Sequence, residues 1–154
     1  MIFKDVIEKF GVNLKELIKS GQLEIIFGSI EPVDEFNVPI KSEGFKISVR
    51  NKYDGGASGN NIEHDPTVKI IAGTIFKYDG MLGLPITISD DPKIFKNADN
   101  DYNRKNAKKY MKTTKKFIKD NRSELDEYWE LNPQTKEGSK RLKELEKEIR
   151  GKYE

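Results

Sequence analysis

A strongly cationic helix is predicted between Arg104 and Arg122, and it constrains the fold more than any other part of the chain. Nine Lys or Arg residues lie in this segment against a single acid, Asp120. Apolar and small side chains recur beside them every three or four residues, which is the spacing of one buried helix face. The members of this apolar face are Ala107, Tyr110, Met111, Thr114, Phe117, Ile118, Leu125, Tyr128 and Trp129. We therefore expect one amphipathic helix over 103–131, with its aromatic residues in the core.

The basic side chains of this helix are also spaced by three or four residues, so they are predicted to form a single cationic ridge. At about 1.5 Å per residue, the ridge is roughly 20 Å long. Such a surface suits the phosphates of a nucleic acid or an acidic partner, although lysine-rich helix faces are also common as solvated surface. If six charges met phosphates, the logarithmic dependence of affinity on salt would have a slope of roughly five. The predicted ridge residues are Lys105, Lys108, Lys112, Lys115, Lys119 and Arg122.

Length and composition limit the class of protein. A chain of 154 residues suits one domain with a sizeable core. Eight Phe, six Tyr and one Trp favour a folded protein, even though 35% of the residues are charged. There is no cysteine, which excludes a disulfide framework and a thiolate zinc site. Since no run approaches the roughly eighteen apolar residues of a membrane helix, we expect a cytoplasmic protein that does not enter the membrane.

Strand patterns precede the basic helix. Residues 1–21 read as a helical pair that caps the main body, and residues 23–88 contain the predicted sheet. Strict alternation predicts a half-buried strand over 45–49, with further strands over 68–76 and 82–88. Because strands and helices are segregated, we predict an α+β fold: a small, mainly antiparallel sheet, the basic helix on one face, and the N-terminal helical pair.

The end of the chain is predicted to be a charged helical tail over 134–154, following a single domain over 1–131. Its apolar stripe is narrow and consists of Leu142, Leu145 and Ile149. A helix this short is marginal without docking. Three interpretations stay open: the tail packs on the domain, frays, or pairs with a protein partner through residues 139–150.

His64 is the only histidine, so any histidine-dependent catalysis within one chain must use it. It lies at the end of the glycine-rich loop over 51–62, just before a predicted strand, where a general acid or base can be placed. A lone loop histidine is more often a turn or surface residue, and one residue type does not establish a site. In the catalytic interpretation, Lys69 or Arg50 would lie near a scissile phosphate.

Neither a cofactor nor a metal is predicted. The glycine-rich loop lacks the Gly-Lys-Ser/Thr that a phosphate-cradling loop requires. Asp90, Asp91, Asp99 and Asp101 offer the oxygen ligands that Mg²⁺ prefers. Asp and Asn also gather before helices because they cap free backbone N–H groups, and this explains the cluster without a metal.

Two fragments carry a family resemblance over about residues 44–131. One is His64-Asp65-Pro66-Thr67-Val68-Lys69-Ile70 at a strand entry, and the other is Asn121-Arg122-Ser123-Glu124-Leu125-Asp126-Glu127-Tyr128-Trp129 in a closing helix. They resemble the His-Asn-Pro-Pro-His-Phe-His-Val strand entry and the closing helix of a family of small uncharacterised bacterial domains, often encoded near toxin–antitoxin genes or on mobile elements. Thr67 and Lys69 stand where that family has histidines. The resemblance therefore implies a compact antiparallel sheet with a C-terminal helix, and a role in phage, plasmid or defence biology, but no histidine chemistry.

Together these observations predict a non-enzymatic interaction protein of a phage or mobile element. Its basic helix would engage nucleic acid or a nucleoprotein complex, as an inhibitor or accessory factor does. The alternative is a toxin-like ribonuclease that uses His64 as acid or base. The third interpretation is an oligomerising protein that associates through the 139–150 helix.

Overall fold

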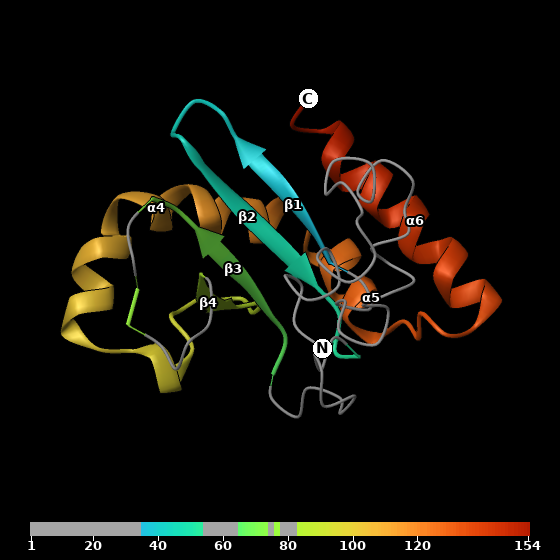
Figure 1. Ribbon diagram of the computed structural model, residues 1–154, viewed down its shortest axis with the longest axis horizontal. Helices are drawn as coiled ribbons and strands as arrows, with labels where there is room; N and C mark the ends of the chain where they lie inside the picture. The colour runs from blue at the N-terminus through green and yellow to red at the C-terminus, as the bar shows by residue number, and fades with distance from the viewer. Residues whose placement is uncertain (1–34, 54–64, 74–75, 78–82) are drawn as a thin grey trace, which may run out of the picture.

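The sheet and the helices occupy successive parts of the chain, so the fold is α+β, as predicted (Figure 1). The structure is a computed structural model that describes residues 35–53, 65–73, 76–77 and 83–154. The helical pair predicted over 1–21 lies outside the described residues, as does His64. The strands are β1 (Glu35–Ile40), β2 (Phe45–Arg50), β3 (Thr67–Ile71) and β4 (Leu84–Thr87). The helices are the short 3-10 helix η2 (Lys96–Ala98), α4 (Asp101–Asp120), α5 (Arg122–Glu130) and α6 (Lys136–Gly151).

The strands pair in the order β1-β2-β3-β4, and each described neighbouring pair is antiparallel. The register aligns Val38 with Ile47, Ile47 with Ile70, and Ile70 with Leu84. One row of branched apolar side chains therefore crosses the sheet on its buried face, where cross-strand neighbours stabilise each other. The strand predicted over 45–49 is confirmed as β2.

The observed strands differ from the expectations in two ways: one strand was not predicted, and another is shorter than predicted. No separate strand is predicted over 35–40, yet Phe36, Val38 and Ile40 are buried in alternation with exposed residues, which is the pattern of β1. Pro39 suits this position because β1 is an edge strand among the strands that the structure describes, where a missing N–H need not break a ladder hydrogen bond. The strand predicted over 68–76 is shorter than expected, since β3 ends at Ile71.

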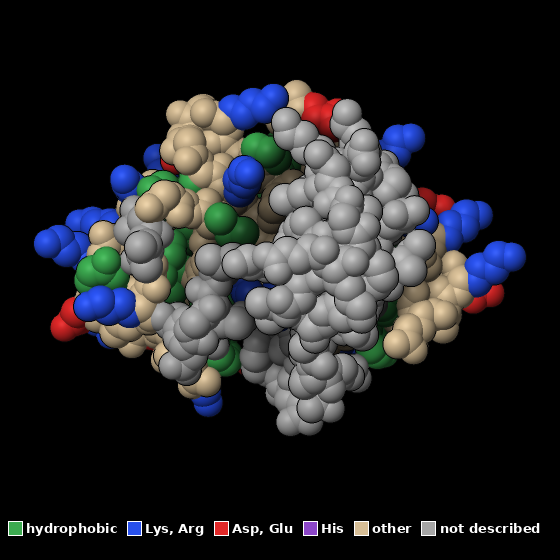
Figure 2. Space-filling view, in the orientation of Figure 1, with side chains coloured by type: hydrophobic (Ala, Val, Ile, Leu, Met, Phe, Trp, Pro, Cys, Tyr) green, Lys and Arg blue, Asp and Glu red, His purple; other side chains and the backbone are tan. Residues whose placement is uncertain are grey.

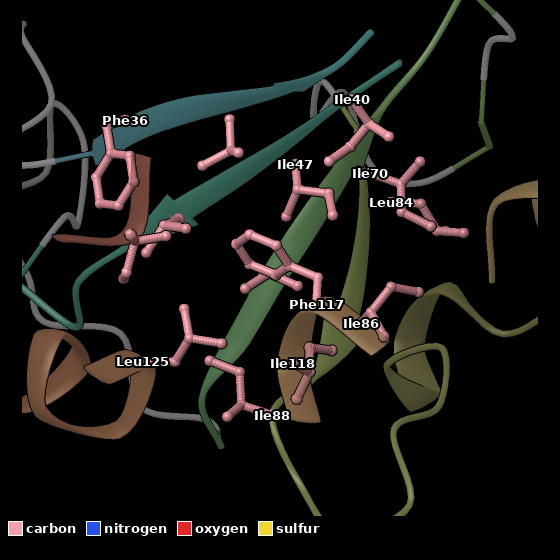
Figure 3. Close-up of a cluster of buried hydrophobic side chains, with 14 of the residues drawn as sticks. Phe36, Ile40, Ile47, Ile70, Leu84, Ile86, Ile88, Phe117, Ile118 and Leu125 are labelled. Carbon is pink, nitrogen blue, oxygen red and sulfur yellow. The ribbon is translucent and has the colours of Figure 1, made fainter. Parts of the chain in front are cut away.

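The core lies between the sheet and the helices. In Figure 3 the labelled side chains of the strands converge on Phe117, Ile118 and Leu125 from α4 and α5. Aromatic contacts tie the layers together, with ring centroids 5.2 Å apart for Phe36 and Tyr128, and 4.8 Å apart for Phe45 and Tyr110. The predicted apolar face of the basic helix is confirmed as core, with Met111 only partly buried.

The basic helix is not continuous, which corrects the expectation of one helix over 103–131. It is interrupted at Asn121, where α4 ends and α5 begins. The Asn121 side chain is fully buried, and its amide donates a hydrogen bond of 2.8 Å to the Phe117 carbonyl. Asn side chains compete in this way for backbone groups and favour helix ends over helix interiors. The same amide also donates to the Tyr153 hydroxyl, so the break is in contact with the residues that follow α6.

Helix α6 is part of the same core. Leu142, Leu145 and Ile149 are buried, so this chain itself covers the narrow stripe. On its flank, Arg141 donates two hydrogen bonds to the Glu127 carboxylate of α5, at 2.5 and 3.0 Å. Pairing with a protein partner through this apolar stripe would therefore require α6 to leave its place on α5.

Candidate nucleic-acid interface

The first turn of α4 is held in place by two asparagines. Asn100 is the N-cap, and its side chain accepts a hydrogen bond of 2.8 Å from the Asn103 backbone N–H. Asn103 is buried and donates to the carbonyl oxygens of Ala98 and Lys77 at 2.8 and 3.0 Å. The cap-forming role expected of this polar segment is confirmed, and it fixes the direction in which α4 leaves the sheet.

Five of the six predicted ridge residues form a line of exposed side chains along α4. At 100° per residue they fall within about 80° of the helix circumference, on the side away from the buried face. None of them forms a salt bridge within the described part of the chain. Lys and Arg side chains project over α4 at the left of Figure 2. These five residues, called the α4 ridge below, are Lys105, Lys108, Lys112, Lys115 and Lys119.

The acids near the α4 ridge are engaged by other cations. Asp120, the one acid of the basic segment, lies 2.6 Å from the Lys116 ammonium, and this hydrogen bond raises the pKa of Lys116. At the other end of α4, Arg104 contacts Asp99 at 2.6 Å and Asp101 at 2.9 Å. The carboxylates are thus paired beside the ridge and leave the charge of its five lysines uncompensated.

Arg122 does not belong to the ridge, which corrects the prediction. It lies in α5, beyond the break at Asn121, and its side chain is half-buried. The guanidinium contacts Asp90 at 2.9 Å and Asp126 at 3.0 Å. Arg122 therefore joins α5 to the segment after β4, and its charge is largely used within the fold.

A cleft of about 750 Å³ adjoins the C-terminal end of the ridge. Lys115 and Lys119 line it on one side, and Asp90 and Asp91 line it on the other. Its mixed charge marks the end of the purely cationic surface. Among the described residues, no group of three or more His, Asp or Glu side chains is placed to hold a metal ion.

Tyr102 is a surface residue that the spacing argument misses. It is 40% exposed and is the one large exposed hydrophobic side chain among the described residues. The Lys77 ammonium lies 4.5 Å from the centre of its ring, and Lys105 follows one helical turn later. An exposed aromatic ring beside lysines can stack on a nucleic-acid base. The sequence could have predicted this exposure, because Tyr102 does not fall on the apolar face of the helix.

The structure describes two of the three residues named in the ribonuclease interpretation, Arg50 and Lys69. Val49 and Val68 are aligned across β2 and β3, and both lie on the buried face of the sheet. Arg50 and Lys69 follow them and therefore lie together on the opposite face. Arg50 is 7% exposed, and Lys69 is half-buried. His64, the third residue of this interpretation, lies outside the described residues.

The chain matches no protein-family model, no curated protein and no solved structure. None of the helices that the structure describes has both the length and the apolar character needed to cross a membrane.

Proposed function

We propose that this protein is a non-enzymatic binding factor whose α4 ridge contacts the phosphate backbone of nucleic acid. The observation that carries the proposal is the line of five exposed lysines without a carboxylate partner among the described residues. From Lys105 to Lys119 this line is roughly 21 Å long. Phosphates supply the matching negative charge, and most protein contacts to nucleic acid are made to phosphate and sugar.

Helix stability does not account for the ridge. Like charges four residues apart destabilise a helix by about 0.2–0.5 kcal/mol per pair, and the ridge contains two such pairs, Lys108 with Lys112 and Lys115 with Lys119. Lys119 near the C-terminus of α4 is favoured by the helix dipole, but Lys105 and Lys108 lie toward its positive end. The arrangement therefore has an energetic cost in the free protein that a polyanionic ligand would remove.

The biological setting we propose is that of an inhibitor or accessory factor of a mobile element, acting on nucleic acid or a nucleoprotein complex. This setting rests only on the resemblance that we infer from the sequence over about residues 44–131, and no protein-family model matches the chain. The ridge adds a mechanism, since occupation of a phosphate surface can block other proteins without any chemical step.

Binding to labelled DNA and RNA at several salt concentrations tests the proposal. Five phosphate contacts give a logarithmic salt slope of about 4.5 on duplex DNA. A ridge variant, K105Q/K108Q/K112Q/K119Q, keeps residues with good helix propensity and should lower the slope to about one. The matched control is K41Q/K46Q/K93Q/K96Q, which removes four exposed lysines outside the ridge.

Wild-type binding with a steep slope that only the ridge variant loses supports the proposal. Equal loss in the control and the ridge variant would show that net charge, rather than the ridge, drives binding. An absence of binding at low salt would overturn the proposal and direct attention to an acidic protein as the partner.

The second candidate function is cleavage of RNA with His64 as acid or base. The observation that favours it is that Arg50 and Lys69 share one face of the sheet. Arg50 is only 7% exposed, so a phosphate would have to enter this face to reach both cations. Incubation of labelled RNA with wild type and H64A, followed by a gel, tests this candidate. Cleavage by wild type that H64A loses would support the ribonuclease, whereas intact RNA with both proteins would remove it.

A further inference from the structure

A second line of lysines lies on α6. Lys136, Lys140, Lys143 and Lys147 are exposed and are spaced by four, three and four residues. At 100° per residue they fall within about 60° of the helix circumference, directly opposite the buried stripe. These four residues, called the α6 stripe below, border one shallow groove on the surface of α6, which Ser139 and Glu144 also line. The stripe is roughly 16 Å long, at about 1.5 Å per residue.

The charge of the α6 stripe is also uncompensated among the described residues. Glu144 and Glu148 lie on the same flank of α6, and both are engaged by Arg141, at 3.3 and 3.5 Å. No salt bridge within the described residues reaches any lysine of the stripe. Lys136 is the first residue of α6, where a cation opposes the helix dipole. Lys140 also has Glu137 and Glu144 three and four residues away, a spacing that supports the helix, so the argument for a ligand rests on the exposed line of lysines and not on helix stability.

The two cationic surfaces face away from each other. Helices α4 and α6 turn their apolar faces into one shared core, and their lysines lie on the opposite sides. Figure 1 shows α4 toward one end of the long axis and α6 toward the other, and Figure 2 shows Lys and Arg side chains projecting at both ends. The two helices are held in a fixed relation, because Lys152 after α6 donates to Asn121 after α4 at 2.9 Å.

We infer that the α6 stripe is a second site for a nucleic-acid backbone, and that one copy of the protein bridges two separate segments of nucleic acid. The inference rests on the proposed function of the α4 ridge and extends it. A nucleic acid bound to the α4 ridge cannot also contact the lysines of the α6 stripe unless it wraps around the whole domain. A second segment can do so directly, and four phosphate contacts would then form on α6.

A capture experiment tests the bridge. One short DNA duplex is immobilised, a second duplex carries a fluorophore, and the full-length protein is added at increasing concentration. Bridging by a single copy predicts that capture rises and then falls, because excess protein occupies each duplex separately. The α6 variant K136Q/K140Q/K143Q/K147Q should keep the affinity and salt slope for one duplex but reduce capture by roughly tenfold or more. The control K41Q/K46Q/K93Q/K96Q should capture like wild type.

The outcomes separate this inference from the proposed function. Steep, ridge-dependent binding to one duplex without capture of a second leaves the proposed function intact and overturns the bridge. Capture that the α6 variant retains also overturns it, since dimers of the protein would then join the duplexes. If the α6 variant lowers the salt slope for a single duplex, both surfaces contact one segment and the bridge is again wrong. No binding by wild type would remove the proposed function itself.

Discussion

The amide nitrogen of Asn121 lies 2.8 Å from the hydroxyl oxygen of Tyr153, and this contact joins the break between α4 and α5 to the end of the chain. The same amide donates to the Phe117 carbonyl, and the Asn121 oxygen accepts from Lys152. Tyr153 also stacks against Phe117, with ring centroids 5.2 Å apart. This cluster joins the end of α4 to the end of α6, the two helices that carry the cationic surfaces.

Replacing Asn121 by Ala should destabilise the fold. The substitution removes a fully buried amide and leaves the Tyr153 hydroxyl and the Lys152 ammonium without their Asn121 contacts. Loss of buried hydrogen bonds of this kind costs about 1–3 kcal/mol. Urea unfolding measures the change, and N97A at an exposed site is the matched control, with an effect below about 0.5 kcal/mol. Equal stability of the two variants would contradict the role given to the cluster.

Gly138 in the first turn of α6 should reject alanine, even though alanine is the better helix former. A Cβ at this position would overlap the Asn132 carbonyl oxygen and would lie 2.6 Å from the Thr135 hydroxyl, which caps α6. G138A should therefore lower the free energy of unfolding by about 1–3 kcal/mol. G151A, with open space around its Cβ, should instead be neutral or gain up to about 1 kcal/mol. Thermal or urea unfolding of both variants shows whether their effects differ in sign.

The ion pair between Glu127 and Arg141 should make a small, pH-dependent contribution to stability. The hydrogen bond from Arg141 lowers the pKa of Glu127 in the folded protein. A lowered carboxyl pKa stabilises the fold above the unfolded value of about 4.3 and loses this effect as pH falls through the folded value.

We expect E127Q to cost less than about 1 kcal/mol at pH 7, because both side chains are more than a third exposed. The difference from wild type should disappear in acid, below the folded pKa of Glu127. Urea unfolding from pH 7 to pH 3 measures this, with E146Q on α6, the helix of Arg141, as the control. A cost for E127Q that stays constant over this range would contradict the ion-pair explanation.

Tyr102 should distinguish single strands from duplexes. Stacking of a base on an exposed aromatic ring contributes about 1–3 kcal/mol, but paired bases in a duplex do not offer their faces. Y102A should therefore weaken binding to single-stranded DNA or RNA by roughly tenfold and leave duplex affinity unchanged. Fluorescence anisotropy with both kinds of ligand measures the effect, and Y102F, which retains the ring, is the control. An equal loss with both ligands would show that Tyr102 acts through the shape of α4.

Local periodicity made several features predictable. The alternation over 45–49 and the three-to-four-residue rhythm of α4 and α5 both follow from the chain itself, because they reflect which face of one element is buried. The burial of Tyr128 and Trp129, and the exposure of five ridge lysines, follow in the same way. The lysines of the α6 stripe are also spaced by three or four residues, so their common helix face is predictable from the sequence in the same way.

Contacts between distant residues decided the rest. An unbroken rhythm runs through Asn121, but Tyr153 and Lys152 meet its side chain there and the helix ends. Arg122 continues the spacing of the ridge, but its guanidinium forms an ion pair with Asp90 from the segment after β4. Spacing along a helix reports which residues share a face, and it carries no information about what another part of the chain places against that face. For this reason the amino-acid sequence by itself determined the fold class and the line of lysines, and only the tertiary structure decided where the ridge ends and which way the two cationic surfaces point.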